Sequence, residues 1–424
     1  MMHGDETTRG LARGRTIVNA RSSRRQVIKR GAAIGFALPM AALVGSPSRT
    51  LAQGSPVAAP SGDPILIGGV YNLTGGLASL DNPARDGSLL AVKEINAAGG
   101  VLGRPLELVV EDGRTDLTTV TNATRKLIEE DSVHALIGLT DTSYALPVAD
   151  LAQDSGIAFL TVGATAPVIT TTGDFIFMLP FGDNVQAAVG AEYAAEQGWT
   201  TCGLMIDDQM DFTKFLAQYF VEAFTAEEVG GEIVAEVTYA TGDTDFSAQL
   251  TELLNLEPQP DFLYISSGPN EIGSIVKQAR DLGIELPIVG GDGYDTPLLV
   301  ELAGDAANNV IFATHQGVYG EDAAADPFRA AFEAEYGEPP PSVFAALGYD
   351  GVKLMADAIN RAGDESAEAI RDALAETSGF QGVTGEVTYE ADNRVPSKGC
   401  ALIEIVDGEF VLLENVTPES VPPA

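Results

Sequence analysis

Few residues in this chain have the types and spacing that catalysis requires. The only histidines are His3, His134 and His315, so an imidazole-based triad would have to use His134 or His315. His134 begins a run that predicts a buried strand, where a structural role is the simpler interpretation, whereas His315 follows a predicted strand end and could contact a ligand. The sequence has no GxGxxG, GxxxxGK[ST], GxSxG or HExxH motif. Carboxylate pairs stay open, because acidic residues are too abundant to be specific.

Metal and cofactor chemistry have equally little support. The chain contains no cluster of Cys and His with the spacing of a zinc site, and we expect no metal and no cofactor. Cys202 and Cys400 are the only cysteines, and each lies in an apolar run. They could pair in an oxidising compartment, but two small buried thiols are the simpler interpretation.

The charge of the chain limits its partners. The 424 residues include 61 acidic and 24 basic ones, for a formal net charge of −37. Residues 1–52 hold nine of the basic residues and two of the acidic ones, which leaves 15 basic and 59 acidic residues and a net charge near −44. A surface this negative repels phosphate backbones and anionic headgroups, so we expect no nucleic-acid partner. Solubility and a saline habitat both remain explanations of the acidity.

The N-terminal region has the pattern of an export signal. Residues 23–29, SRRQVIK, precede an apolar stretch at 31–44 that is too short to span a bilayer comfortably. The paired arginines before this stretch resemble a twin-arginine signal, which carries folded proteins across a membrane. We therefore interpret residues 1–52 as a twin-arginine signal peptide cleaved near Ala52, and residues 53–62 as a flexible linker. The mature chain, with no later membrane span in its sequence, is expected to be soluble and either periplasmic or extracellular.

From residue 64 onward, short β-type runs alternate with helical stretches, which predicts parallel sheets with crossover helices. A first set of expected strands covers residues 65–70, 106–111, 135–138 and 158–162, with helices at 83–97, 116–130 and 143–154. A second set has strands at 202–207, 233–238, 262–265, 287–290 and 311–314, with helices at 184–197, 212–229, 246–254 and 271–282. Later helices are expected at 327–336, 342–362 and 366–376, and later strands at 385–389, 401–406 and 409–413.

Two consecutive doubly wound units predict two α/β lobes. We assign residues 63–183 and 316–394 to an N-terminal lobe, residues 184–315 and 395–417 to a C-terminal lobe, and residues 418–424 to a tail. The late helices have no strand between them, so we expect them to return to the first lobe. The chain would then cross between the lobes more than once, which forms a hinge beside a ligand cleft.

Several segments resemble the leucine/isoleucine/valine-type solute-binding proteins of ABC importers, which have the type I periplasmic-binding-protein fold. The likeness is closest in EINAAGGVLGRPLELVVED within residues 73–116, and it continues through GIAFLTVGATAP, QARDLGIELPIVGGDGYDTPLLVELAG, YGEPPPSVFAALGYDGVKLMADAI and GVTGEVTYEADN. These segments follow one another in order and cover nearly all of residues 64–413. The resemblance implies two doubly wound parallel-sheet lobes joined by three crossovers.

The resemblance also implies an amino-acid site. In this family a hydroxyl residue after the third strand binds the ligand carboxylate, and Thr142, preceded by Asp141, occupies that position. Because this loop opens a helix, its free N–H groups favour an anion, although Thr142 could equally be a plain N-cap. In the segment 163–165 the resemblance assigns a carbonyl contact with the ligand ammonium to Gly163 and a hydroxyl and amide contact to Thr165, and Ala164 lies between them.

On the second lobe the resemblance assigns the ligand ammonium to Asp292, in the run GGDG at a strand end, where an ordinary Asp-Gly turn is the alternative. The expected aromatic wall is altered. Leu80 stands where the family often has tyrosine, Gly268 and Pro269 replace frequent tyrosines, and Phe212 or Asp211 falls at a further wall position. A branched-chain amino acid is therefore one candidate ligand, and another amino acid or an amide is its rival.

The function that these features favour is capture of an amino acid in the cleft and its delivery to the permease of an ABC importer, by a protein that is not an enzyme and is expected to be a monomer. A sensory module that presents the ligand to a receptor is a second hypothesis, which neighbouring genes would distinguish. An enzyme on the same scaffold is a third, which turnover of the ligand would reveal.

Overall fold

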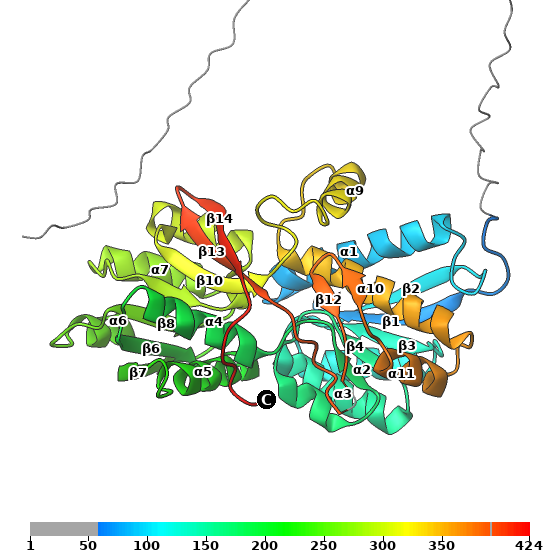
Figure 1. The fold of residues 1–424 in the computed structure, drawn as a ribbon, viewed down its shortest axis with the longest axis horizontal. Coiled ribbons are helices and arrows are strands. Elements are labelled where there is room, and N and C mark those ends of the chain that lie inside the picture. The colour runs from blue at the N-terminus through cyan, green and yellow to red at the C-terminus, as the bar shows by residue number, and fades with distance from the viewer. Residues whose placement is uncertain (1–57, 391) are drawn as a thin grey trace, which may run out of the picture. The chain divides into compact units, whose positions relative to one another are not determined.

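The computed structural model describes residues 58–390 and 392–424. The expected signal peptide, its cleavage site near Ala52 and the first part of the linker lie outside the described residues. The described chain forms one compact unit that contains two large sheets, each covered by helices, and a small two-stranded one (Figure 1). Its architecture is the α/β fold with two lobes that the sequence predicts.

The first lobe is built on a five-stranded parallel sheet in the order β2-β1-β3-β4-β5. Its strands and helices are β1 (Ile65–Tyr71), α1 (Ala78–Ala97), β2 (Leu106–Asp112), α2 (Leu117–Glu129), β3 (Ala135–Gly138), α3 (Thr142–Ser155), β4 (Phe159–Thr161), the 3-10 helix η1 (Pro167–Thr172) and β5 (Ile176–Met178). The strands β3, β4 and β5 are completely buried, as expected where helices cover both faces of a parallel sheet.

The second lobe repeats the same strand order and then extends it. Its elements are α4 (Asp183–Glu196), β6 (Thr201–Asp207), α5 (Asp211–Phe224), β7 (Glu232–Tyr239), α6 (Ser247–Leu254), β8 (Phe262–Ser266), α7 (Ile272–Asp281), β9 (Ile288–Gly290), η2 (Asp292–Tyr294), α8 (Pro297–Ala303), η3 (Gly304–Ala307) and β10 (Val310–His315). The sheet runs β14-β13-β10-β9-β8-β6-β7, and β13 (Cys400–Val406) and β14 (Glu409–Val416) are the antiparallel strands at one edge.

The segment between β10 and β13 belongs to the first lobe. It contains α9 (Asp326–Tyr336), α10 (Val343–Ala362), α11 (Ala367–Ala375) and the small hairpin of β11 (Phe380–Gly382) and β12 (Gly385–Val387). Helix α10 lies along α1, where Gly87 and Gly348 let the two backbones approach closely. The chain therefore passes between the lobes three times: after β5, after β10 and before β13.

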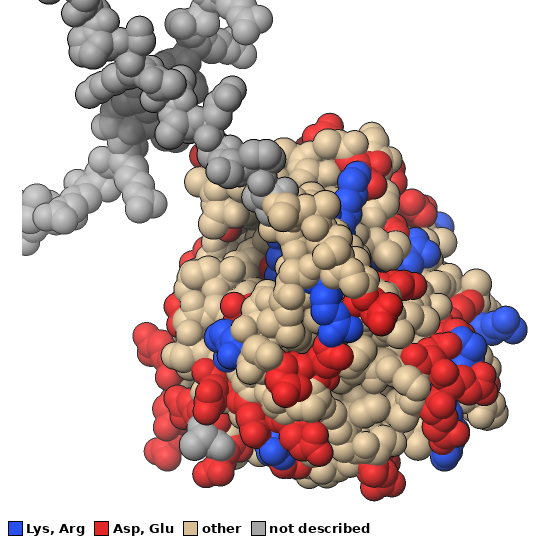
Figure 2. Space-filling view, turned by 90° about the vertical axis from the view of Figure 1, so that its right-hand side faces the viewer, with Lys and Arg blue, Asp and Glu red and all other residues tan. Residues whose placement is uncertain are grey.

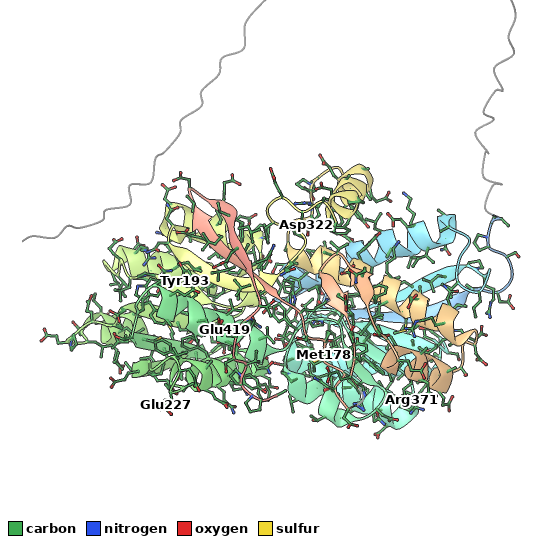
Figure 3. All side chains as sticks on the ribbon, viewed as in Figure 1. Met178, Tyr193, Glu227, Asp322, Arg371 and Glu419 are labelled. Carbon is green, nitrogen blue, oxygen red and sulfur yellow. The ribbon has the colours of Figure 1, made fainter. Side chains whose placement is uncertain are left out.

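The first and third passages are joined side by side. Met178, at the end of β5, donates its N–H to the carbonyl of Arg394 at 3.0 Å and accepts a hydrogen bond from the Tyr389 hydroxyl at 2.8 Å. Met178 lies in the first lobe close to the second (Figure 3). The chain leaves each sheet for the other lobe at the carboxyl end of a strand, β5 in the first and β10 in the second. Open α/β sheets of this strand order bind ligands at the carboxyl ends of their strands.

The surface carries the acidity that the sequence predicts. On the face drawn in Figure 2, acidic side chains predominate over basic ones. None of the helices in residues 58–390 and 392–424 is long and apolar enough to cross a membrane.

Candidate functional site

A narrow cavity of about 10 Å³ lies between the lobes. The first lobe contributes five lining residues, which are Leu77, Leu80, Thr140, Asp141 and Phe344. The second lobe contributes the other five, which are Met210, Phe212, Pro269, Asp292 and Gly293. Because both lobes line it, a solute bound here would touch both and favour their approach.

The polar end of the first lobe follows β3 and opens α3. Asp141 is the N-cap of α3, and its Oδ1 accepts the N–H of Ser143 at 2.9 Å. Burial raises the pKa of Asp141 to about 6, and the charge of Asp211 adds to the effect. Within the described chain, the Oγ1 atoms of Thr140 and Thr142 are buried without hydrogen-bond partners. Thr140 and Asp141 line the cavity, whereas Thr142 is completely buried beside them.

The segment 163–165 follows β4 and lies behind the cavity wall. A Cβ atom on Gly163 would come within 3.0 Å of both Thr140 and Phe344, so a larger residue would push these lining side chains. Thr165 accepts the N–H of Asp183 through its carbonyl at 2.8 Å. Gly163, Ala164 and Thr165 are buried and stand outside the set of lining residues. The segment 163–165 therefore packs behind the lining residues Thr140 and Phe344 and does not itself line the cavity.

Asp292 is the acidic residue of the second-lobe wall. It follows β9 at the start of η2, is 2% exposed and lines the cavity. The Gln186 side chain holds it from two sides, because Oε1 accepts the Asp292 N–H at 2.9 Å and Nε2 donates to Oδ1 at 3.2 Å. The other oxygen, Oδ2, has no hydrogen-bond partner in the described part of the chain, although His315 Nε2 lies 3.3 Å away.

His315 stands behind Asp292 and outside the lining set. It is completely buried at the end of β10 and stacks on Phe181, with the ring centroids 3.8 Å apart. Burial lowers the pKa of His315, against the opposing effect of Asp292. The sequence left open whether His315 touches a ligand. In the structure His315 lies behind Asp292 and does not line the cavity.

Asp183, which the sequence did not single out, is a second carboxylate near Asp292. It begins α4 directly after the first passage between the lobes, and its Oδ1 accepts Gln186 Nε2 at 3.0 Å. Burial raises the pKa of Asp183 well above the usual range of a carboxyl group. Its place at a lobe crossing within the run FGDNVQ is the signal that could have identified it.

The apolar walls combine expected and unexpected residues. Leu80, Phe212 and Pro269 line the cavity at positions that the sequence identified. Gly268 lies just behind, and a Cβ atom there would be 3.0 Å from Met210 Cε. The sequence missed Leu77, Met210 and Phe344, of which Phe344 comes from the first turn of α10. Phe344 and Phe212 restore an aromatic lining where tyrosines were expected.

The lobes also touch beside the cavity. The Asp211 N–H at the start of α5 donates to Ser143 Oγ on α3 at 3.0 Å. This hydrogen bond joins the two helices that open on either side of the cavity, so it belongs to the closed arrangement of the lobes.

Other reactive groups lie away from the cavity. Cys202 and Cys400 are both buried free thiols in the described chain, and burial raises the pKa of each. No group of three or more His, Cys, Asp or Glu side chains in residues 58–390 and 392–424 could hold a metal ion.

Comparison with known proteins gives a consistent result. The family described as "Periplasmic binding protein" matches residues 64–409. A leucine-, isoleucine-, valine-, threonine- and alanine-binding protein of Pseudomonas aeruginosa is 28% identical over 77% of this chain and 86% of its own length. The Leu/Ile/Val-binding protein BraC3 of Rhizobium johnstonii is 30% identical over 82% of this chain and 94% of its own length.

Solved structures agree in fold. The branched-chain amino acid transporter substrate binding protein LivJ of Streptococcus pneumoniae, solved in complex with isoleucine, is 33% identical with a TM-score of 0.78, covering 84% of this chain and 100% of that one. A leucine binding protein of Thermotoga maritima is 30% identical with the same TM-score, covering 84% of this chain and 99% of that one. The two-lobed α/β fold expected from the sequence is therefore confirmed.

Proposed function

Because this chain belongs to the periplasmic binding protein family, we propose that it captures an amino acid or a close analogue in the cavity between its lobes and delivers it to an ABC importer. The relatives named above are described as binding branched-chain and other small amino acids. The chemistry of the cavity lining supports such a ligand, because apolar side chains lie on both walls beside acidic and hydroxyl groups.

Asp292 is the observation that carries this proposal. Asp292 lines the cavity, and Gln186 fixes the orientation of its carboxylate. Its Oδ2 has no hydrogen-bond partner among the described residues, with His315 Nε2 3.3 Å away. A buried carboxylate in this state strongly favours a charge-assisted hydrogen bond from a cation. The ammonium of an amino acid, held at Asp292 while its remaining groups contact Thr140, Leu80 and Phe344, would connect the two lobes.

The experiment is a calorimetric and thermal-shift screen of the twenty amino acids and their amides. A ligand that binds only the folded protein raises its stability by about 2.7 kcal/mol at a hundredfold excess over Kd. The Asp292→Asn variant should bind the best ligand about a hundredfold more weakly, since a buried ammonium would lose its counter-charge. Asp208→Asn is the matched control, because Asp208 is an exposed residue that follows β6 and lies outside the cavity lining. A screen without any ligand, or an unchanged affinity of Asp292→Asn, would contradict the proposal.

We also propose that the protein is exported by the twin-arginine route, cleaved near Ala52, and acts as a monomer with a membrane permease as partner. The support is the SRRQVIK run before a short apolar stretch and the family to which the chain belongs. Replacing Arg24 and Arg25 with lysine should leave the precursor in the cytoplasm, which fractionation with an antibody would detect. Export that continues unchanged would exclude this route.

A further inference from the structure

We infer that Asp141 determines the head group of the ligand, and that at neutral pH the cavity prefers an amine-bearing carboxamide over the corresponding free α-carboxylate. This inference rests on the proposed function, because it takes the ligand amine to be held by Asp292. It adds the chemistry of the opposite end of the ligand, where two candidate head groups were left open.

The side chain of Asp141 occupies the N-terminus of α3. The first free N–H groups of a helix are a natural site for an anion. Here Asp141 Oδ1 already accepts the Ser143 N–H at 2.9 Å, and Asp141 itself lines the cavity. A ligand carboxylate at this end would therefore meet a carboxylate of the protein in the place where it needs a donor.

The ionisable groups around Asp141 are mostly acidic. The groups whose charges act on or near Asp141 are Asp81 on α1, Tyr144 on α3, Asp183 on α4 and Asp211 on α5, with Asp292 across the cavity. Lys214 pairs with one member of this set, Asp211, through Oδ1 at 2.6 Å. The cavity lining of the described chain includes no Lys, Arg or His. No protein cation in the lining thus offsets a second negative charge.

A carboxamide would fit this end of the cavity, because it has both a hydrogen-bond donor and an acceptor. Its NH₂ group would donate to Asp141, and its carbonyl would accept from the buried Thr140 Oγ1, which lies beside the Asp81 carboxyl group without a close hydrogen bond within the described residues. A carboxylate supplies acceptors alone and leaves the Asp141 oxygen facing another anion. A site built to accept a hydrogen bond discriminates strongly against a ligand that lacks the donor.

The discrimination should depend on pH. Burial raises the pKa of Asp141 to about 6, so this carboxyl is mostly ionised at pH 7 and mostly protonated at pH 5. The protonated group donates a hydrogen bond, which turns the anion-repelling end into one that accepts a carboxylate. Free amino acids should therefore bind more tightly at pH 5 than at pH 7, while their amides should change little.

The test is isothermal titration of matched pairs, L-leucine with L-leucinamide and L-valine with L-valinamide, at pH 7 and pH 5. For the wild-type protein we expect the amide to bind at least about tenfold more tightly at pH 7, since juxtaposed like charges are strongly unfavourable, and the gap to close at pH 5. In Asp141→Asn the acid should gain about tenfold at pH 7 and lose its pH dependence. Asn is as good an N-cap as Asp, so the helix should be retained, and Asp141→Ser provides a second variant with a capping side chain.

Asp116→Asn is the matched control, because Asp116 caps α2 in the same way but outside the cavity. It should leave the acid-to-amide ratio unchanged. Equal affinity of acid and amide for the wild type at pH 7, or an unchanged ratio in Asp141→Asn, would overturn the inference while leaving the proposed function intact. Absence of binding of every pair to every variant would overturn both.

Discussion

At the scale of single residues, Gln186 is the side chain on which the ligand-binding carboxylate depends. It contacts Asp292 through two hydrogen bonds and Asp183 through one. Gln186→Leu should free Asp292 to rotate and weaken binding of the amine-bearing ligand about tenfold or more, because a buried carboxylate oxygen and an N–H lose their partners. Titration calorimetry of the ligand identified by the screen measures this loss.

A second glutamine separates positioning from general destabilisation. Gln278 bridges backbone groups in the same lobe, accepting the Phe246 N–H and donating to the Thr244 carbonyl, but it lies away from the cavity. Gln278→Leu should lower the melting temperature without changing Kd. If both variants weaken binding equally, Gln186 acts only through stability.

The sequence located the loops of the site better than the side chains that face it. Asp141, Asp292, Leu80 and Phe212 line the cavity as the sequence expected, whereas Thr142 and the segment 163–165 stand behind it. Consecutive loop residues point in different directions, and only the packing of the whole lobe decides which one faces a ligand. Phe344 joins the cavity wall from helix α10, about two hundred residues after Asp141 in the chain. No local pattern in the sequence predicts that these two residues approach each other.

At the scale of elements, the pairing of α1 with α10 depends on glycine. A Cβ on Gly348 would lie 1.8 Å from the Ala84 carbonyl oxygen, and a Cβ on Gly87 would lie 1.8 Å from that of Ala345. Gly348→Ala would force apart two helices that build the first lobe, so we expect a loss of about 2–4 kcal/mol in the free energy of unfolding. Chemical denaturation monitored by circular dichroism measures the change.

Gly190 provides the matched control in α4. A Cβ there would make ordinary contacts, the nearest at 3.4 Å to Tyr264. Gly190→Ala should be neutral or stabilise the protein by about 0.4–1 kcal/mol, because alanine restricts the unfolded chain more than glycine does. Equal effects at the two positions would show that helix propensity, and not the close crossing, sets the outcome.

The alternation of strands and helices was predictable from the spacing of apolar residues. Helices show apolar residues three or four positions apart, and the buried strands are short continuous apolar runs. The expected long elements are all present, with ends that differ by a few residues. The elements that escaped prediction are short: β5, β11, the helix α8 and the 3-10 helices η1, η2 and η3. The strands β5 and β11 have three residues each, which is too short to show a hydrophobic period.

At the scale of the whole molecule, the two lobes share the strand order 2-1-3-4-5, and the second adds an antiparallel pair. The sequence could reveal this repeat, since each half reads as one doubly wound unit. It could not reveal how many carboxyl groups the folded molecule buries. Asp81, Asp141, Asp183, Asp292 and Asp295 are all almost fully buried, and they come from both lobes.

These carboxylates should make the ligand-free protein most stable in mild acid. Burial raises the pKa of Asp81 and of Asp295 to about 7 and that of Asp141 to about 6. Each raised pKa means that the folded state holds a proton that the unfolded chain releases above pH 4, so stability falls as the pH rises from 4 through 7. Carboxylates with a lowered pKa act in the opposite way below pH 4, as at Asp261, where the N–H of Thr200 stabilises the charge.

We therefore expect the melting temperature to peak near pH 5 and to be about 5 °C lower at pH 8. The net charge adds to this trend, because ionised surface carboxylates repel one another, and salt should restore more stability at pH 8 than at pH 5.

Asp295→Asn should flatten the pH dependence of the melting temperature, since Asp295 is fully buried between Thr314, Tyr319 and the start of α10. Asp208→Asn, which removes the same charge from the surface, should not flatten it. Scanning calorimetry across pH 4–8 decides the matter, and a melting temperature that rises toward pH 8 would show that the buried carboxyl groups are ionised in the folded protein.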